Sequence, residues 1–303
     1  MGIDFTVFKG STTGDIVESK GHRDPGPREA IVKISHCGVC GTDEHYRHAD
    51  MGLGHEGVGI ITEVGSAVHD ISDLRVGDRV GMGWFHKFCG YCKACLTGRQ
   101  DHCSNSTSFG TADHDQGCFG TGVAWDVSTL AKIPKEIASE DAGPLMCGGI
   151  TVWNPLYNYG LRAGDRVGVV GVGGLGHMAI QFAHKMGMEV VVFSSTDSKK
   201  QQALDFGAAE FVTTSGKETL DDIAKLDALL ITTSANPDLS LRVIIVGSGV
   251  GPAASIQDML AFAAKNGVRP QIEKFPMTQA GIVEAMQRLR DGKMRYRGVL
   301  VAP

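Results

Sequence analysis

Apolar and polar residues alternate in the first part of the chain, in short runs separated by glycine and proline. Residues 5–8 and 30–34 show the period of two that is typical of half-buried strands, and residues 23–27 between them have turn chemistry. Helical periods are few before residue 150. The pattern therefore predicts an irregular β domain in the first half of the chain.

A different pattern begins near residue 166, where β-branched apolar runs alternate with segments of helical period. Strands are predicted at 167–170, 189–193, 210–213, 227–232 and 241–246, with a helix over 177–185. Strands that alternate with helices are typical of a parallel sheet, so we predict an α/β fold with a doubly wound parallel sheet. Helices over 255–265 and 279–290 and a strand over 296–301 complete the chain.

One connection in this second half is unusually short. Residues 233–240 alone separate the predicted strands 227–232 and 241–246. A parallel neighbour needs a crossover of about a dozen residues. We therefore predict that the sheet lacks a late strand or that its last strands are rearranged.

The strand at 167–170 runs into a glycine-rich turn, Gly171-x-Gly173-x-x-Gly176, and a helix follows at once. This order is typical of a dinucleotide-binding site. The first glycine permits the tight turn, the second lets the backbone approach a pyrophosphate, and the third allows close packing of helix and strand. The pyrophosphate would lie at the helix N-terminus, beside Gly174 and Leu175. A glycine-rich loop without a ligand is the alternative.

The end of the next strand bears on the choice of cofactor. NAD-binding chains place an acidic residue there for the ribose 2′-hydroxyl. This chain instead offers three hydroxyl groups, from Ser194, Ser195 and Thr196, and two ammonium groups, from Lys199 and Lys200. Such groups suit a 2′-phosphate, so the segment favours NADP(H) over NAD. Asp197 is an acidic residue in the same segment, so NAD is the alternative cofactor. The alternative for Lys199 and Lys200 is the solvated face of the next helix.

Composition and charge narrow the classes of function. A chain of 303 residues can form two domains, each with its own core. Its net charge of −5 argues against a nucleic-acid partner, and no apolar run approaches the ~20 residues that span a bilayer. Eight cysteines without an N-terminal secretory signal favour metal-binding thiolates over disulfides, in a cytoplasmic protein without a membrane partner.

Four of the cysteines lie close together in one glycine-bearing loop, at Cys89, Cys92, Cys95 and Cys103. Four thiolates at this spacing suit a closed, tetrahedral structural zinc site. A redox dithiol needs only two cysteines, and the acidic chain argues against a nucleic-acid zinc knuckle. We therefore predict structural zinc.

A second metal site is predicted from residues far apart in the chain. Cys40 and His55 are ligands of the kind that zinc prefers, and Cys147 is the candidate for a third. Two cysteines and one histidine are the set that the catalytic zinc of alcohol dehydrogenase uses, and they leave one position open for substrate. The alternative is one buried cysteine and one core histidine without a metal.

These motifs together resemble those of a known family. The resemblance rests on residues 37–43, 54–56, 89–103, 115–117, 145–149, 170–176 and 294–300. It points to the zinc-dependent medium-chain alcohol dehydrogenases of the cinnamyl-alcohol-dehydrogenase type, with the fungal NADP-dependent branch as the closest match. The resemblance implies a GroES-like catalytic zinc domain over 1–148 plus 268–303, and a Rossmann NADP-binding domain over 149–267.

The resemblance also implies roles for residues near the second metal site. Cys40, His55 and Cys147 would bind the catalytic zinc with Glu56 beside them, and Asp43 would orient the imidazole. Thr42 would hydrogen-bond the alcohol oxygen, and His45 would pass the proton to water. Trp84 or Phe85 would line the substrate pocket, although core packing accounts for either aromatic ring equally well.

The implied protein is a homodimer with two zinc ions per chain and NADP(H). It would transfer a hydride between the cofactor and a small aldehyde, ketone or alcohol, with fungal secondary metabolism as one setting. Family members have a further strand and a long loop where this chain has residues 233–240. A non-catalytic relative that binds zinc and nucleotide but has lost turnover is therefore the competing hypothesis.

Overall fold

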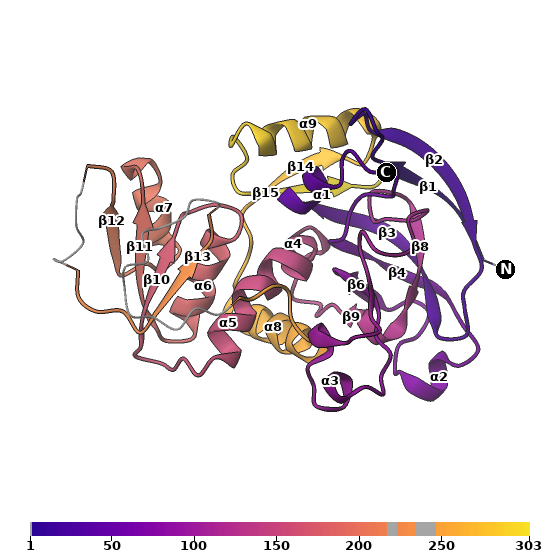
Figure 1. The fold of residues 1–303 in the computed structure, drawn as a ribbon, viewed down its shortest axis with the longest axis horizontal. Helices are drawn as coiled ribbons and strands as arrows, with labels where there is room; N and C mark the ends of the chain where they lie inside the picture. Colours follow the sequence, from indigo (N-terminus) through magenta and orange to yellow (C-terminus); the bar gives the residue numbers. More distant parts are fainter. Residues whose placement is uncertain (1, 217–222, 234–246) are drawn as a thin grey trace.

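The computed structural model describes residues 2–216, 223–233 and 247–303. Figure 1 shows a larger lobe, which contains both termini, and a smaller lobe built from the middle of the chain. The predicted strand at 241–246 and most of the short connection before it lie outside the described residues. No helix among those described is long and apolar enough to cross a membrane.

The larger lobe is built around a seven-stranded sheet with the path β14-β15-β3-β4-β5-β9, to which β8 adds beside β3. Its strands are β3 (Glu29–Val39), β4 (Gly57–Val64), β5 (Arg79–Met82), β8 (Gly122–Asp126), β9 (Ala131–Lys132), β14 (Ile272–Pro276) and β15 (Arg297–Val301). β14 and β15 pair in parallel, and α9 (Gln279–Arg290) connects them. The first half of the chain is thus an irregular β domain, as its alternation predicts.

β3 is the centre of this sheet because it is long enough to pair with three strands. β4 lies along one edge, while β8 and β15 share the other edge, β8 at 29–33 and β15 at 36–39. Most of the buried apolar residues of these strands belong to one core cluster, which also includes Phe119. The final strand of the chain is therefore built into the N-terminal domain.

Smaller elements surround this sheet. The strands are β1 (Ile3–Lys9) and β2 (Val17–Arg23), which pair with each other, and β6 (Phe85–Lys87) and β7 (Thr107–Ser108), which form a second pair. The helical segments are α1 (Gly41–His45), α2 (Val68–Ile71), α3 (Lys93–Leu96), η1 (Gln100–His102) and η2 (Val127–Thr129).

The smaller lobe contains a parallel sheet with the order β12-β11-β10-β13 among the described strands. The strands are β10 (Arg166–Val170), β11 (Glu189–Ser194), β12 (Glu210–Thr213) and β13 (Ala228–Ile231), and the helical segments are α6 (Gly176–Lys185), η4 (Asp197–Lys199) and α7 (Lys200–Asp205). α6 packs against β10 and β11. The prediction of a Rossmann-type parallel sheet is confirmed.

A continuous helical stretch joins the two lobes. It consists of α4 (Ser139–Pro144), the π-helical turn η3 (Leu145–Gly149) and α5 (Ile150–Asn158). α5 packs against α6 and against α8 (Ala253–Asn266), and one core cluster extends from this stretch into the parallel sheet. The domain boundary expected at residue 148 falls inside η3.

Candidate active site and metal centres

The ends of four strands meet at one edge of the larger sheet. Antiparallel pairing sets Cys37 opposite Gly57, so the end of β3 lies beside the start of β4. Val39 pairs with Gly298, which brings the start of β15 to the same edge. Gly57 also pairs with Met82, the last residue of β5. Residues that follow β3 and β5 therefore lie close to residues that precede β4 and β15.

A network around Asp43 fixes the first two predicted metal ligands. Cys40 caps the N-terminus of α1: its Sγ accepts from the backbone N–H of Thr42 at 3.3 Å. The fully buried Asp43 accepts from the N–H groups of Cys40 and Gly54, and from Nδ1 of His55 at 3.0 Å. Since Nδ1 is occupied, Nε2 of His55 faces the Sγ of Cys40, 3.2 Å away.

The third predicted ligand, Cys147, comes from η3. The ligand atoms of Cys40, His55, Glu56 and Cys147 lie within 4.8 Å of one another. The Cys147 thiol hydrogen-bonds the Cys40 sulfur and, with the nearby imidazole, holds the pKa of Cys40 well below its usual value, although burial opposes this. A thiol with a depressed pKa and an imidazole whose Nε2 points at that thiol form a donor set that fits zinc.

Glu56 has a second partner that sequence analysis did not identify. The fully buried Glu56 accepts both its hydrogen bonds from the guanidinium of Arg297, which is 5% exposed. Burial raises the pKa of Glu56 to about 7, although the charge of Arg297 opposes this rise. A Cβ at Gly38 would overlap the Glu56 carboxylate, so the carboxylate depends on that glycine.

Arg297 also connects this site to the smaller lobe. A Cβ built on Gly174, in the glycine turn, would lie 3.1 Å from its Cδ. Arg297 was not predicted because it contacts Glu56 only through the strand register, across 241 positions of sequence. The candidate metal ligands and the glycine turn are thus joined through one arginine.

Thr42 and His45, the predicted proton-transfer residues, both lie on α1 next to Cys40. Thr42 is half-buried, whereas His45 is exposed at the end of the helix. This order, from a buried position to solvent, fits the relay that the resemblance implies. Arg290 of α9 forms an ion pair with Glu44, the residue between Asp43 and His45, at 2.7 Å, and so ties α1 to the C-terminal part of the chain.

Aromatic side chains cover the imidazole of His55. Trp84 meets it edge-on at 5.8 Å between ring centroids, and Phe109 lies 4.7 Å from it. Trp84 and Phe85 line an apolar pocket together with Met146. The structure thus places both predicted aromatic residues at a pocket beside Cys147, and adds the buried Phe109, which no sequence motif indicated.

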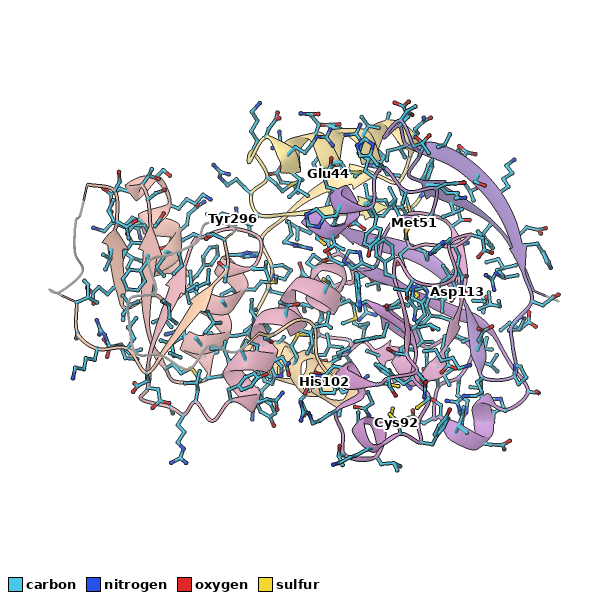
Figure 2. The ribbon with its side chains drawn as sticks, in the orientation of Figure 1. Glu44, Met51, Cys92, His102, Asp113 and Tyr296 are labelled. Atoms are coloured by element: carbon cyan, nitrogen blue, oxygen red, sulfur yellow. The ribbon has the colours of Figure 1, made fainter. Side chains whose placement is uncertain are left out.

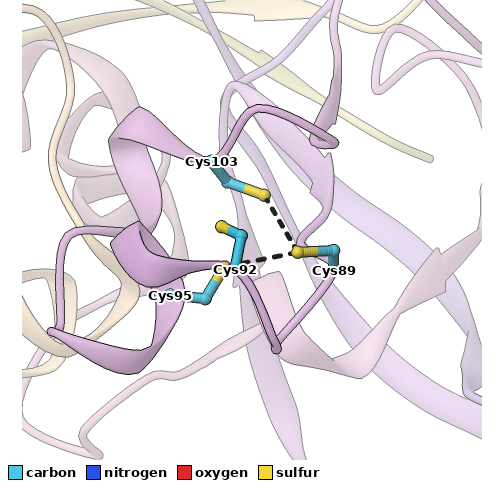
Figure 3. A group of neighbouring side chains, drawn as sticks. All are labelled: Cys89, Cys92, Cys95 and Cys103. Atoms are coloured by element: carbon cyan, nitrogen blue, oxygen red, sulfur yellow. Dashed lines mark hydrogen bonds between the residues drawn. The ribbon is translucent and has the colours of Figure 1, made fainter.

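The four cysteines of the other predicted site converge in their own loop (Figure 3). The sulfur atoms of Cys89, Cys92, Cys95 and Cys103 lie within 4.8 Å of one another, and Cys89 and Cys103 are 3.5 Å apart. Burial opposes ionisation of Cys89, but the backbone N–H groups of Tyr91 and Cys92 lower its pKa to about 6. Figure 2 shows Cys92 at the edge of the larger lobe, away from Tyr296 at the junction.

The glycine turn has the close contacts that its pattern predicts. Gly171 has a φ of +92°, in the left-handed region, and a Cβ on Gly176 would lie 2.0 Å from the carbonyl oxygen of Gly171. A Cβ on Gly173 would meet nothing within 4 Å, so the backbone there is open to a ligand. Leu175 is the residue before α6 and packs against the core.

The residues expected near a 2′-phosphate lie at the carboxyl end of β11. Ser194 ends the strand and is half-buried, while Ser195 and Thr196 are exposed. Asp197 accepts a hydrogen bond from the hydroxyl of Thr213, so its carboxylate is already engaged with β12. The acidic residue that could have bound the ribose of NAD thus already binds a protein hydroxyl.

Lys199 does not join the solvated face of a helix. Its ammonium group turns back toward the glycine turn and donates to the carbonyl oxygen of Val172 at 2.6 Å. No carboxylate among the described residues lies within 4 Å of it. A half-buried cation without a counter-ion in the described part of the chain, next to an open glycine turn, fits a phosphate-bearing cofactor.

Comparisons with known proteins agree with this geometry. Residues 26–135 match the family model "Alcohol dehydrogenase GroES-like domain", and residues 174–269 match "Zinc-binding dehydrogenase". A probable formaldehyde dehydrogenase of Bacillus subtilis is 34% identical, with 94% of this chain and 92% of the relative covered. Its alignment of 329 positions exceeds the 303 residues of the chain, so part of the relative has no counterpart here.

NADP(H) is named for two further similar proteins. An NADP-dependent alcohol dehydrogenase of Mycolicibacterium smegmatis is 33% identical, with 92% of this chain and 91% of the relative covered. The crystal structure of a cinnamyl alcohol dehydrogenase from Helicobacter pylori, complexed with NADP(H), superposes with a TM-score of 0.86 at 27% identity, covering 99% of each chain.

Proposed function

We propose, because the chain belongs to the zinc-type medium-chain alcohol dehydrogenase family of oxidoreductases, that it transfers a hydride between NADP(H) and an alcohol or the corresponding aldehyde or ketone. One observation carries the proposal. Arg297 bonds Glu56, beside the Cys40–His55–Cys147 set, and packs against Gly174 of the cofactor turn. The residues that would hold the metal and those that would hold the cofactor are therefore in contact through a single side chain.

Two zinc ions per chain fit the two groups of ligands. Cys40, His55 and Cys147 would hold the catalytic ion, while the four cysteines of the 89–103 loop would hold a structural one. When bound, the catalytic zinc supplies a Lewis acid for the substrate oxygen and NADP(H) supplies or accepts the hydride.

The chain's own residues would orient the reactants and move the proton. Asp43 fixes the tautomer of His55 through Nδ1. Thr42 would hydrogen-bond the substrate oxygen, and the exposed His45 would exchange the proton with solvent. Trp84 and Phe109 pack on the imidazole and would exclude water from that side of the site. The pocket that Trp84 and Phe85 line would receive the organic part of the substrate.

The preference for NADP(H) is part of the proposal. It is supported by the hydroxyls of Ser194, Ser195 and Thr196 and by the ammonium of Lys199, which has no counter-ion within the described ranges. The cofactor named for two relatives also supports it. The domain limits, the fungal branch with its role in secondary metabolism, the cytoplasmic location and the homodimer remain our predictions from the sequence.

The direct test is a panel of alcohols and carbonyl compounds, with NADPH followed by its absorbance. We expect turnover from the wild-type chain, two zinc ions per chain by elemental analysis, and no turnover from Cys40→Ser, which should keep one zinc ion. Cys118→Ala is the matched control, because it removes another buried thiol that lies outside both groups. Zinc and NADPH binding without turnover on any substrate would favour the non-catalytic relative instead.

A further inference from the structure

Tyr296 belongs to the C-terminal segment but packs into the cofactor lobe. It is 2% exposed, and its backbone N–H donates to the carbonyl oxygen of Gln271 at 3.0 Å. Its ring stacks on the imidazole of His177 in α6, with centroids 5.0 Å apart and planes 23° apart. Its hydroxyl donates to Oε1 of Gln202 in α7. One face of the ring and its hydroxyl are thus held by residues of the parallel-sheet lobe.

The ammonium group of Lys199 lies over the ring of Tyr296. Nζ lies 5.1 Å from the ring centroid, within the range of a cation–π contact, while it donates to Val172. Burial and the positive charge of Arg295 both lower the pKa of Lys199. The ammonium is therefore held in place by a ring and a carbonyl, neither of which neutralises it.

We propose that Tyr296 is a positioning residue for cofactor selection: its ring holds Lys199 at the glycine turn, where the ammonium meets the 2′-phosphate of NADP(H). The inference rests on the proposed function and adds the residue through which Lys199 selects NADP(H) over NAD. A lysine side chain has four rotatable carbon–carbon bonds and moves freely unless packing restrains it. Without the ring, Lys199 would lose its preferred position, and the affinity for the phosphate would fall.

The test compares two nucleotide fragments that differ in the 2′-phosphate, 2′,5′-ADP and 5′-AMP, by titration calorimetry. Tyr296→Met fills the space without a ring, and Tyr296→Phe keeps the ring but loses the bond to Gln202. Lys199→Met defines the loss when the ammonium is absent. Tyr157→Leu is the control for loss of a tyrosine ring, because Tyr157 stacks on Trp153 in α5.

We expect the wild-type chain to bind 2′,5′-ADP more tightly than 5′-AMP, and Tyr296→Met to reduce that ratio about tenfold. Tyr296→Phe and Tyr157→Leu should keep the ratio. Adding Tyr296→Met to Lys199→Met should lower it no further, because Tyr296 acts through the lysine.

Two results separate the inference from its premise. A wild-type chain that binds both fragments equally would refute the NADP(H) preference itself. A wild-type preference that Tyr296→Met leaves intact would overturn the role of Tyr296 alone. If Tyr296→Met does not fold, a crystal structure of the wild-type chain with 2′,5′-ADP decides: the inference requires Nζ of Lys199 to contact the 2′-phosphate while it lies over the Tyr296 ring, and a Lys199 that leaves the ring to reach the phosphate overturns it.

Discussion

Replacing Arg297 by methionine is the sharpest test of the contact between the two lobes. The change removes the guanidinium but keeps an unbranched apolar stem, so Glu56 stays fully buried without its ion-pair partner. Removing one partner of a buried ion pair costs about 3–5 kcal/mol, because the remaining charge is left without compensation. We expect the free energy of unfolding to fall by that amount.

Guanidinium unfolding followed by tryptophan fluorescence can measure this loss. Trp125 and Trp153 are buried in the two separate core clusters, so the signal reports on both lobes. All variants should be saturated with zinc, so that metal occupancy does not differ between them. Adding Glu56→Gln to Arg297→Met should recover part of the loss, because the stranded carboxylate is then removed as well.

A second ion pair provides the comparison. Arg288 pairs with Glu273 at 2.5 Å, but their side chains are 38% and 23% exposed. Partly solvated pairs of this kind contribute about 0–1 kcal/mol. Arg288→Met should therefore change the stability little. If Arg297→Met costs no more than Arg288→Met, the reasoning about the buried contact is refuted.

Three further predictions use the same preparations. Gly176→Ala should lower the free energy of unfolding by about 1–3 kcal/mol, because its Cβ would lie 2.0 Å from the carbonyl oxygen of Gly171. Gly173→Ala should leave the free energy of unfolding unchanged, because its Cβ meets nothing within 4 Å, but calorimetry should show weaker NADPH binding. Asp43→Asn should weaken zinc binding about 10–100-fold in a chelator competition, and an unchanged affinity would contradict the orienting role. Burial lowers the pKa of His177 from 6.5 in the unfolded chain to about 4 in the folded chain. Between these two pH values the imidazole is protonated only when the chain is unfolded, so the free energy of unfolding should fall by about 3 kcal/mol as the pH drops from 6.5 to about 4. His177→Gln should remove most of this pH dependence in unfolding curves, and an identical slope would count against it.

Elements with a strong and uninterrupted pattern were predicted well from the sequence. The strand at 210–213 and the helix at 279–290 are confirmed at their predicted limits. The sequence analysis missed α5, which contains Pro155, and β14, which ends in Pro276. Proline interrupts the patterns by which helices and strands are recognised, and here tertiary packing overrides that local preference.

The two groups of metal ligands differ in how far sequence could predict them. The four cysteines of the 89–103 loop are close in sequence, so spacing alone brings them together. Cys40 and Cys147 are far apart, and spacing could only offer Cys147 as a candidate. Their meeting depends on the register between β3, β4 and β15 and on the path of η3. Phe109 was missed for the same reason, since no local pattern distinguishes it from a core residue.

The two neighbouring residues Tyr296 and Arg297 show what a sequence motif cannot reveal. Tyr296 contacts His177 and carries Lys199, whereas Arg297 bonds Glu56 beside the candidate metal ligands. Each contact crosses more than ninety positions of the chain, so neither partner is visible locally. Because the two residues are covalently joined, a shift of β15 along β3 would move the support of Lys199 and the partner of Glu56 together. The register of one C-terminal strand therefore couples the position of the cofactor's phosphate site to that of the metal site.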